Sequence, residues 1–166
     1  MQRIAAVILG AVLAWGAGAD AAVLSRVTVD YPEEGAVFPP EIAAPTFLWR
    51  DASQNARAWL IEVTFADGSP AIRVESAGQR LQIGEIDPRA VSSNNQLPKL
   101  TPMQAAERTW IPDSAVWGEI KKHSVEHQAK VSISGYRDGE LRDAVSRGSV
   151  AIRTSKDPAG APIFSQ

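Results

Sequence analysis

The feature that most constrains the fold is a two-residue alternation of large apolar side chains within residues 58–68, AWLIEVTFADG. Side chains two positions apart point to the same face of a β-strand, so this pattern predicts a strand with one buried face. Asp67 and Gly68 close the run with a common turn dipeptide. The buried face would carry four large side chains, Trp59, Ile61, Val63 and Phe65.

The same period returns along the chain from residue 24 onward. Short alternating runs are separated by proline, glycine and Asp-Gly turn signals, and long helical patterns do not lie between them. About seven strands spaced in this way predict an all-β fold: an immunoglobulin- or fibronectin type III-like antiparallel sandwich with one or two short helices in its loops. The inward residues of the other runs are Val27 and Val29, Phe47 and Trp49, Ile72 and Val74, Leu81 and Ile83, Val131 and Ile133, and Val150 and Ile152.

Residues 87–112 break this rhythm with prolines and a polar run, and they form a connection longer than is usual in a compact domain. Within it, Thr101 and Gln104 have the spacing of a capping box, with proline at the first helical position. This predicts one or two turns of helix. A second short helix is predicted over residues 113–122, where the apolar positions share one face.

The composition excludes several classes of protein. The chain has 0 Cys, so it holds no disulfide framework, thiolate metal site or haem-attachment motif. Its 17 Lys and Arg are interspersed with 19 Asp and Glu, so the sequence shows no basic stripe for nucleic acid. No phosphate-binding loop, dinucleotide fingerprint or serine-nucleophile elbow is present. We therefore expect no cofactor and no catalytic residue.

The first 21 residues indicate a secretory signal peptide, because Arg3 precedes an apolar run that ends in small residues. We expect cleavage after Ala19 or Ala21. The apolar run is about a dozen residues, short of the roughly 20 that span a membrane as a helix, so we expect a periplasmic or secreted protein without a membrane span. The expected domains are 1–21 for the signal peptide, 22–157 for the sandwich and 158–166 for an exit tail or truncated linker.

The sharpest apparent motif is HSVEH, residues 123–127, which contains both histidines of the chain. It fits the H-x-x-E-H string of inverted zinc metallopeptidases. Two imidazoles four positions apart converge on a helix, but they lie about 13 Å apart on a strand. The motif sits where a short helix gives way to an alternating run, so we expect His127 near the entry of a strand. A zinc hydrolase is therefore only a remote alternative, and we assign no metal ligand.

Two tryptophans, Trp110 and Trp117, lie outside the clear strand patterns. If exposed, they would offer a stacking surface for a carbohydrate or another ligand. A free-standing ligand-binding module is therefore one alternative function. Packing of the short helix onto the edge of the sandwich would also explain both residues.

Three stretches resemble one family when taken together: YPEEGAVFPPEIAAPTFLWRDAS, LPKLTPMQAAERTWIPDSAVWGEIKKHS and VAIRTSKDPAGAPIFSQ. They are similar to the N-terminal region of large secreted bacterial proteins whose later parts form a TolB-like β-propeller, often with a c-type haem segment between. The haem cysteines and propeller blades of that family have no matching positions here. The resemblance therefore implies a role but transfers no site residue.

The leading expectation is a non-enzymatic secreted or periplasmic accessory module, the N-terminal part of a larger propeller-containing protein. Its partner would be a downstream propeller, a haem-bearing module or another envelope protein. In this interpretation the fold ends at about Thr154, and Ile163 and Phe164 in the tail would dock on the following module.

Overall fold

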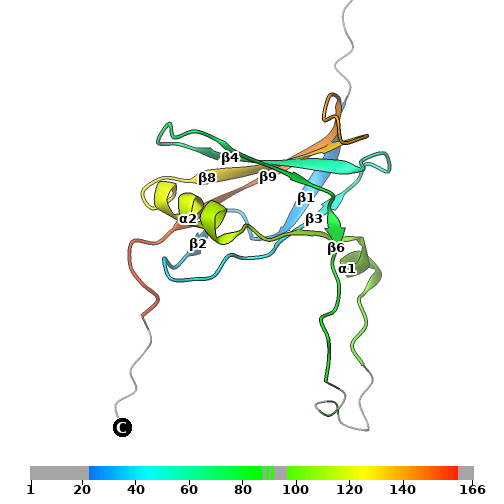
Figure 1. Cartoon of the computed structure of the whole chain (residues 1–166), viewed down its shortest axis with the longest axis horizontal. Coiled ribbons are helices and arrows are strands. Elements are labelled where there is room, and N and C mark those ends of the chain that lie inside the picture. The colour runs from blue at the N-terminus through cyan, green and yellow to red at the C-terminus, as the bar shows by residue number, and fades with distance from the viewer. Residues whose placement is uncertain (1–22, 88, 90, 92–96, 161–166) are drawn as a thin grey trace, which may run out of the picture.

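The computed structural model describes residues 23–87, 89, 91 and 97–160, which form a mainly β fold with two short helices (Figure 1). The prediction of a β-rich fold with short helices is confirmed at this level. The strands are β1 (Ser25–Tyr31), β2 (Ala36–Phe38), β3 (Phe47–Asp51), β4 (Ala58–Phe65), β5 (Ile72–Ser76), β6 (Gln79–Arg80), β7 (Arg108–Trp110), β8 (Ala129–Tyr136) and β9 (Ala144–Thr154), and the helices are α1 (Pro102–Ala106) and α2 (Ser114–His123).

The strands form one mixed sheet in the order β5-β4-β8-β9-β1-β3-β7-β6, with β2 also paired to β9. The prediction of a purely antiparallel arrangement was wrong, because β1 and β2 both run parallel to β9. The two strands at the ends of this order, β5 and β6, are separated in sequence only by Ala77 and Gly78. The sheet is therefore nearly closed into a barrel and is not clearly an immunoglobulin sandwich.

The alternate apolar side chains of β4 point into the core. The side chains of Trp59, Ile61, Val63 and Phe65 are buried, while β4 pairs antiparallel with β5 on one side and β8 on the other. Full burial of a side chain of this size contributes about 1.5–3 kcal/mol. The four inward positions of β4 are therefore a major part of the free energy that holds the sheet together.

The strand predicted through Leu81 and Ile83 was wrong. Strand β6 ends at Arg80, and Ile83 is 40% exposed. The physical reason is the partner: β7 has three residues, and its pairing with β6 ends at Arg80 opposite Arg108. Strands β2 and β7 were not predicted, because three residues are too few to show a period.

Both predicted helices are confirmed. At α1, Thr101 and Gln104 form the reciprocal capping box. At α2, the Asp113 carboxylate accepts a hydrogen bond from the backbone N–H of Val116 at 2.8 Å. The buried face of α2 carries Trp117 and Ile120, so the helix covers one end of the core.

A partly buried polar knot joins three strands at the other end of the core. Oδ2 of Asp51 on β3 accepts hydrogen bonds from Trp59 Nε1 at 2.8 Å and from Ser146 Oγ at 2.6 Å. The other carboxylate oxygen accepts from the backbone N–H of Ser53 at 2.8 Å. A Cβ at Gly135 would lie 2.3 Å from Ser146 Oγ, so only glycine fits beside this knot.

Two segments leave the body on the same side, at opposite ends (Figure 1). The first, here called the arm, is the described part of the irregular segment between β6 and α1, residues 81–87, 89, 91 and 97–101. The second, here called the exit segment, is residues 155–160, which follow the end of β9 at Thr154. The predicted end of the strand at Thr154 is confirmed, whereas the predictions for the signal peptide and for Ile163 and Phe164 lie outside the described residues.

Within the described part of the chain, no helix has the length and apolar character needed to cross a bilayer.

Candidate functional site

The structure separates the residues of the HSVEH motif. His123 is the last residue of α2, and His127 is exposed in the bend before β8, near the strand entry as predicted. Glu126 turns to Lys156, whose ammonium group lowers the pKa of this carboxyl. The two imidazoles therefore do not share a helical face. Among the described residues, no three His, Cys, Asp or Glu side chains are grouped so that they could hold a metal ion.

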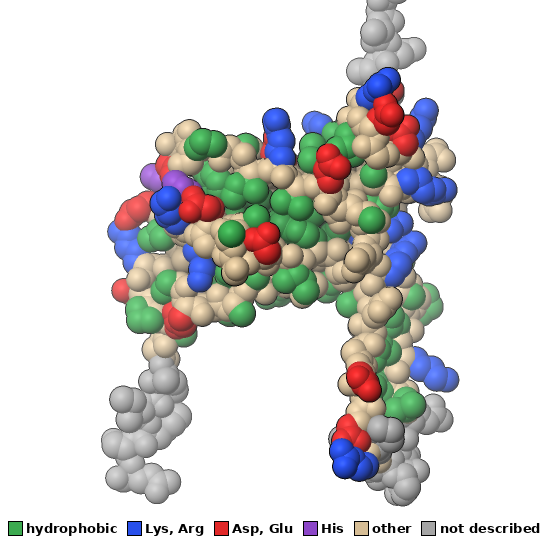
Figure 2. Space-filling model, in the orientation of Figure 1, with side chains coloured by type: hydrophobic (Ala, Val, Ile, Leu, Met, Phe, Trp, Pro, Cys, Tyr) green, Lys and Arg blue, Asp and Glu red, His purple; other side chains and the backbone are tan. Residues whose placement is uncertain are grey.

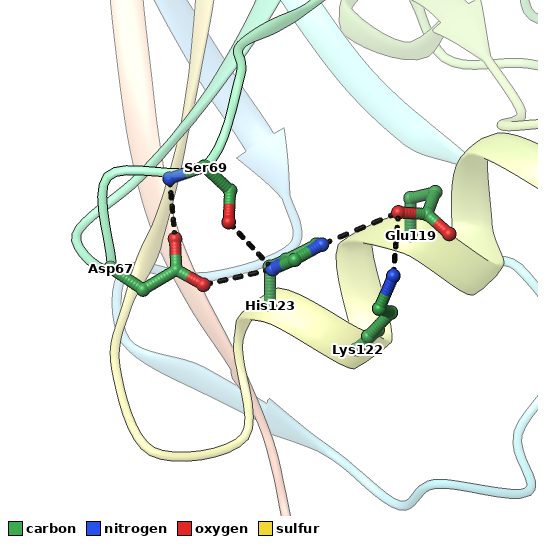
Figure 3. Close-up of polar contacts among 5 residues, drawn as sticks. All are labelled: Asp67, Ser69, Glu119, Lys122 and His123. Atoms are coloured by element: carbon green, nitrogen blue, oxygen red, sulfur yellow. Dashed lines mark hydrogen bonds and ion pairs between the residues drawn. The ribbon is translucent and has the colours of Figure 1, made fainter.

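His123 lies in a polar corner formed by the end of α2 and the turn after β4 (Figure 3). Its Nδ1 lies 2.8 Å from Asp67 Oδ2 and 2.8 Å from Ser69 Oγ. Its Nε2 lies 3.3 Å from Glu119 Oε2, one helical turn earlier. The ring also packs on Phe65, with centroids 5.2 Å apart. We call these groups the His123 corner.

The His123 corner contains a serine, a histidine and an aspartate, but it is not arranged as a catalytic triad. In a triad the aspartate holds one ring nitrogen and the other nitrogen receives the proton of the serine. Here Asp67 and Ser69 both lie at Nδ1, and Nε2 faces Glu119. The carboxylate of Asp67 therefore competes with Ser69 for the same ring nitrogen, which is not the arrangement of a triad.

The electrostatics of the corner favour a structural clamp. The backbone N–H of Ser69 and, next, the ring of His123 lower the pKa of Asp67 to about 2. The same carboxylate thus fixes its own turn, through Ser69 N at 2.9 Å, and the end of α2, through His123 at 2.8 Å. Both ring nitrogens donate to carboxylates when the ring is an imidazolium. Lys122 Nζ also lies 3.4 Å from Glu119 Oε2, so each carboxylate of the corner faces the imidazole and Glu119 faces a second basic group as well.

The two tryptophans proposed as a stacking surface are both buried. Trp117 is 3% exposed, packs edge-to-face on Phe38 and donates from Nε1 to the carbonyl oxygen of Ile42 at 3.0 Å. Trp110 lies in β7, is 9% exposed and packs on Phe47 with ring centroids 5.1 Å apart. Neither indole presents a flat face to solvent, as a stacking platform requires.

A second cluster escaped the sequence analysis. Four arginines from separate parts of the chain line one pocket next to the Asp51 knot: Arg50, Arg57, Arg80 and Arg108. Arg80 and Arg108 are far in sequence from Arg50 and Arg57, and the near-neutral overall charge conceals the convergence of the four. Within the described residues, the pairing of β6 with β7 places Arg80 opposite Arg108, and no local sequence pattern signals this pairing.

Comparison with models of known families, with curated proteins and with solved structures found no match for this chain. The resemblance to the propeller-associated proteins therefore stays a prediction, and function is inferred below from the geometry together with that resemblance.

Proposed function

We propose that this chain is a non-enzymatic secreted or periplasmic accessory module that packs against the module following it in the same polypeptide, a TolB-like propeller in the family it resembles. The single observation that carries this proposal is that the arm and the exit segment leave the body on the same side (Figure 1). A module attached after the exit segment would therefore lie on the side to which the arm extends.

The exit segment is held against the body, which supports a defined direction of departure. The backbone N–H of Ser155 donates to the carbonyl oxygen of Phe38 at 2.8 Å. The backbone N–H of Ala159 donates to Glu41 Oε1 at 2.6 Å. The chain is thus attached to the loop after β2 until close to residue 160. A following module would be tethered near this point, and tethering raises its effective concentration at the arm.

The arm and its base carry apolar side chains that the body does not cover. Figure 2 shows hydrophobic side chains along the arm. Large exposed apolar side chains suit a surface that another module buries. Those in this region are Ile83 at 40%, Leu97 at 57%, Met103 at 58% and Ile111 at 61% exposure.

A finer fold assignment belongs to the same proposal. We infer an immunoglobulin- or fibronectin III-like relationship from the contact between two layers of the sheet. Trp49 of β3 and Trp59 of β4 pack edge-to-face across the core, with ring centroids 6.4 Å apart. Facing layers joined by inward aromatic side chains are the general plan of such sandwiches.

The first test is to read the DNA beyond codon 166. The proposal expects an open reading frame, continuous or recovered by a frameshift, that encodes a propeller. An intergenic gap at that point would contradict it.

The second test measures docking directly, by calorimetry between the full chain and the separately produced following module. A variant combining Ile83→Ser, Leu97→Ser and Ile111→Ser should weaken binding by about tenfold or more, because each loses buried apolar area. The matched control combines Val23→Ser and Leu24→Ser, which are exposed apolar residues outside both the arm and its base. Equal affinity of the arm variant and the control would overturn the docking surface.

A further inference from the structure

The arginine pocket has a charge pattern that the proposed accessory role does not explain. It is a cavity of about 300 Å³ bounded by β3 and the turn after it, by β6, and by the chain from the end of α1 into β7. Figure 2 shows basic side chains along the right-hand end of the body, above the arm. The residues lining the cavity are Arg50, Asp51, Ser53, Gln54, Ala56, Arg57, Arg80, Ala106 and Arg108.

One of the four arginines is neutralised by a carboxylate. Arg50 donates from Nε and Nη2 to the two carboxylate oxygens of Asp30, at 2.8 and 2.6 Å. This bidentate pair fixes the guanidinium and matches its charge. Arg50 therefore forms part of the wall of the pocket but contributes no unmatched charge.

The other three arginines donate their hydrogen bonds to backbone carbonyl oxygens of described residues. Arg57 Nη1 donates to Gln54 at 2.8 Å, and Arg80 Nη1 donates to Ala106 at 2.6 Å. Arg108 Nη1 donates to the carbonyl oxygen of residue 78 at 2.7 Å. Within the described residues, none of the three forms an ion pair with a carboxylate.

These bonds leave hydrogen-bond donors available. A guanidinium has five N–H donors, and the bonds of these three side chains to described residues all leave from Nη1. The edge formed by Nε and Nη2 is the edge with which arginine binds an oxyanion in bidentate fashion. Three such edges therefore belong to residues that line one cavity.

Asp51 is the one carboxylate in the wall of the pocket, and its oxygens are already occupied. They accept hydrogen bonds from Trp59, Ser146 and the backbone of Ser53. Its negative charge offsets part of the positive charge of Arg57, Arg80 and Arg108. These three arginines and Asp51 together leave two positive charges, and Glu107, a buried carboxylate whose charge acts on Arg50, reduces this excess without removing it.

Arg108 shows the electrostatic effect of this arrangement. The guanidinium carbon lies 4.0 Å from the centroid of a Trp59 ring, and the side chain is half-buried. Burial lowers the pKa of Arg108, the nearby charges of Arg80 and Arg57 lower it further, and Asp51 opposes them. A bound anion would relieve this repulsion.

We propose that the arginine pocket binds a small phosphate-type oxyanion, either free phosphate or the terminal group of a phosphate ester. The charge of a phosphate group near neutral pH, about −1.5 to −2, is opposite in sign to the positive excess of the pocket. Its tetrahedral oxygens can accept hydrogen bonds from several guanidinium edges at once. The cavity volume is at the lower end of the range for ligand pockets, which suits a small group better than a large organic ligand.

The experiment is a titration of the full chain with inorganic phosphate at constant ionic strength, followed by arginine side-chain NMR and by the thermal unfolding midpoint. We expect saturable shifts of the Nε–H resonances of Arg57, Arg80 and Arg108, and a midpoint that rises with phosphate concentration. Parallel titrations use a simple phosphate monoester, sulfate and acetate. Tighter binding of the monoester would identify an ester as the ligand, and tighter binding of phosphate would identify the free ion.

The variants are Arg57→Gln and Arg80→Gln, whose side chains are exposed and should not be needed for folding. Each should weaken phosphate binding by about tenfold, because a charge-assisted hydrogen bond is lost. The matched control is Arg153→Gln, an exposed arginine at the far end of β9. Non-saturable shifts, equal loss in Arg153→Gln, or preference for sulfate or acetate over both phosphate species would overturn the proposal.

Discussion

The charged groups at the two ends of the molecule differ in the partners that they contact. At the His123 corner, the imidazole lies between two carboxylates, Asp67 and Glu119. At the arginine pocket, Arg57, Arg80 and Arg108 contact backbone carbonyl oxygens, and the nearest carboxylate is occupied by other donors. At the first end the carboxylates face His123 and Lys122, so the charged groups are paired within the fold, whereas the second end keeps an excess of positive charge.

This difference shows which of the two regions is suited to a ligand. In a matched cluster the charged groups are already paired with other groups of the fold, so substitutions there should alter the free energy of unfolding. An unmatched cluster that lines a cavity retains donors and charge for an external group. The predictions below test this division, from the largest expected effect to the smallest.

The largest effect is expected at the Asp51 knot, which supports the base of the arginine pocket. Asp51→Ala removes the acceptor of two buried donors, Trp59 Nε1 and the Ser146 hydroxyl. Each orphaned buried donor costs about 1–3 kcal/mol, so the free energy of unfolding in urea titrations should fall by about 2–4 kcal/mol. The control is Asp87→Ala at an exposed ion pair with Arg89, where we expect a change within about 0.5 kcal/mol. Equal losses in both variants would contradict the role of the knot.

A smaller loss is expected at the His123 corner. His123→Ala removes the contacts with Asp67 and Ser69 and the packing on Phe65, so it should lower the free energy of unfolding by about 1 kcal/mol. His127→Ala is the matched control, because this histidine is exposed, and it should have no measurable effect. If both substitutions reduced stability equally, the corner would not be a clamp.

The stability of the chain at acidic pH tests the contribution of Asp67 to the same clamp. The pKa of this carboxyl is about 2 in the folded chain against an ordinary value of 3.8. A lowered folded-state pKa adds stability that is fully present above about pH 4 and is lost as the pH falls toward 2. Asp67→Asn should therefore lose less stability than the wild type between pH 4 and pH 2, measured by thermal unfolding. Parallel pH profiles of the two proteins in this window would contradict the assignment.

The smallest effect on stability is expected at the arginine pocket itself. Arg57→Gln and Arg80→Gln remove exposed side chains that contact only carbonyl oxygens, so without phosphate the free energy of unfolding should change by about 0.5 kcal/mol or less. Urea titration in a phosphate-free buffer is the measurement. A loss of more than about 1 kcal/mol would show that these arginines serve the fold.

The sequence predicted the local features of the fold because these depend on neighbouring residues. The inward face of β4, the cap at Thr101 and the second short helix all follow from patterns within a few positions, and the structure confirms them. The parallel pairing of β1 and β2 with β9 could not be predicted, because it depends on contacts between distant segments.

The candidate site shows the same limit. The histidines cluster in sequence, yet the end of α2 at His123 separates them in space. The arginines are scattered in sequence, yet the pairing of β6 with β7 and the turn after β3 bring Arg57, Arg80 and Arg108 to one cavity. Side chains that gather through tertiary structure leave no pattern in a single sequence.

The most direct test compares both ends in one sample, by recording arginine and histidine side-chain NMR spectra of the full chain during titration with inorganic phosphate at constant pH and ionic strength. The account predicts saturable shifts of Arg57, Arg80 and Arg108, with the ring resonances of His123 unchanged. Shifts at His123 with none at the three arginines would contradict it.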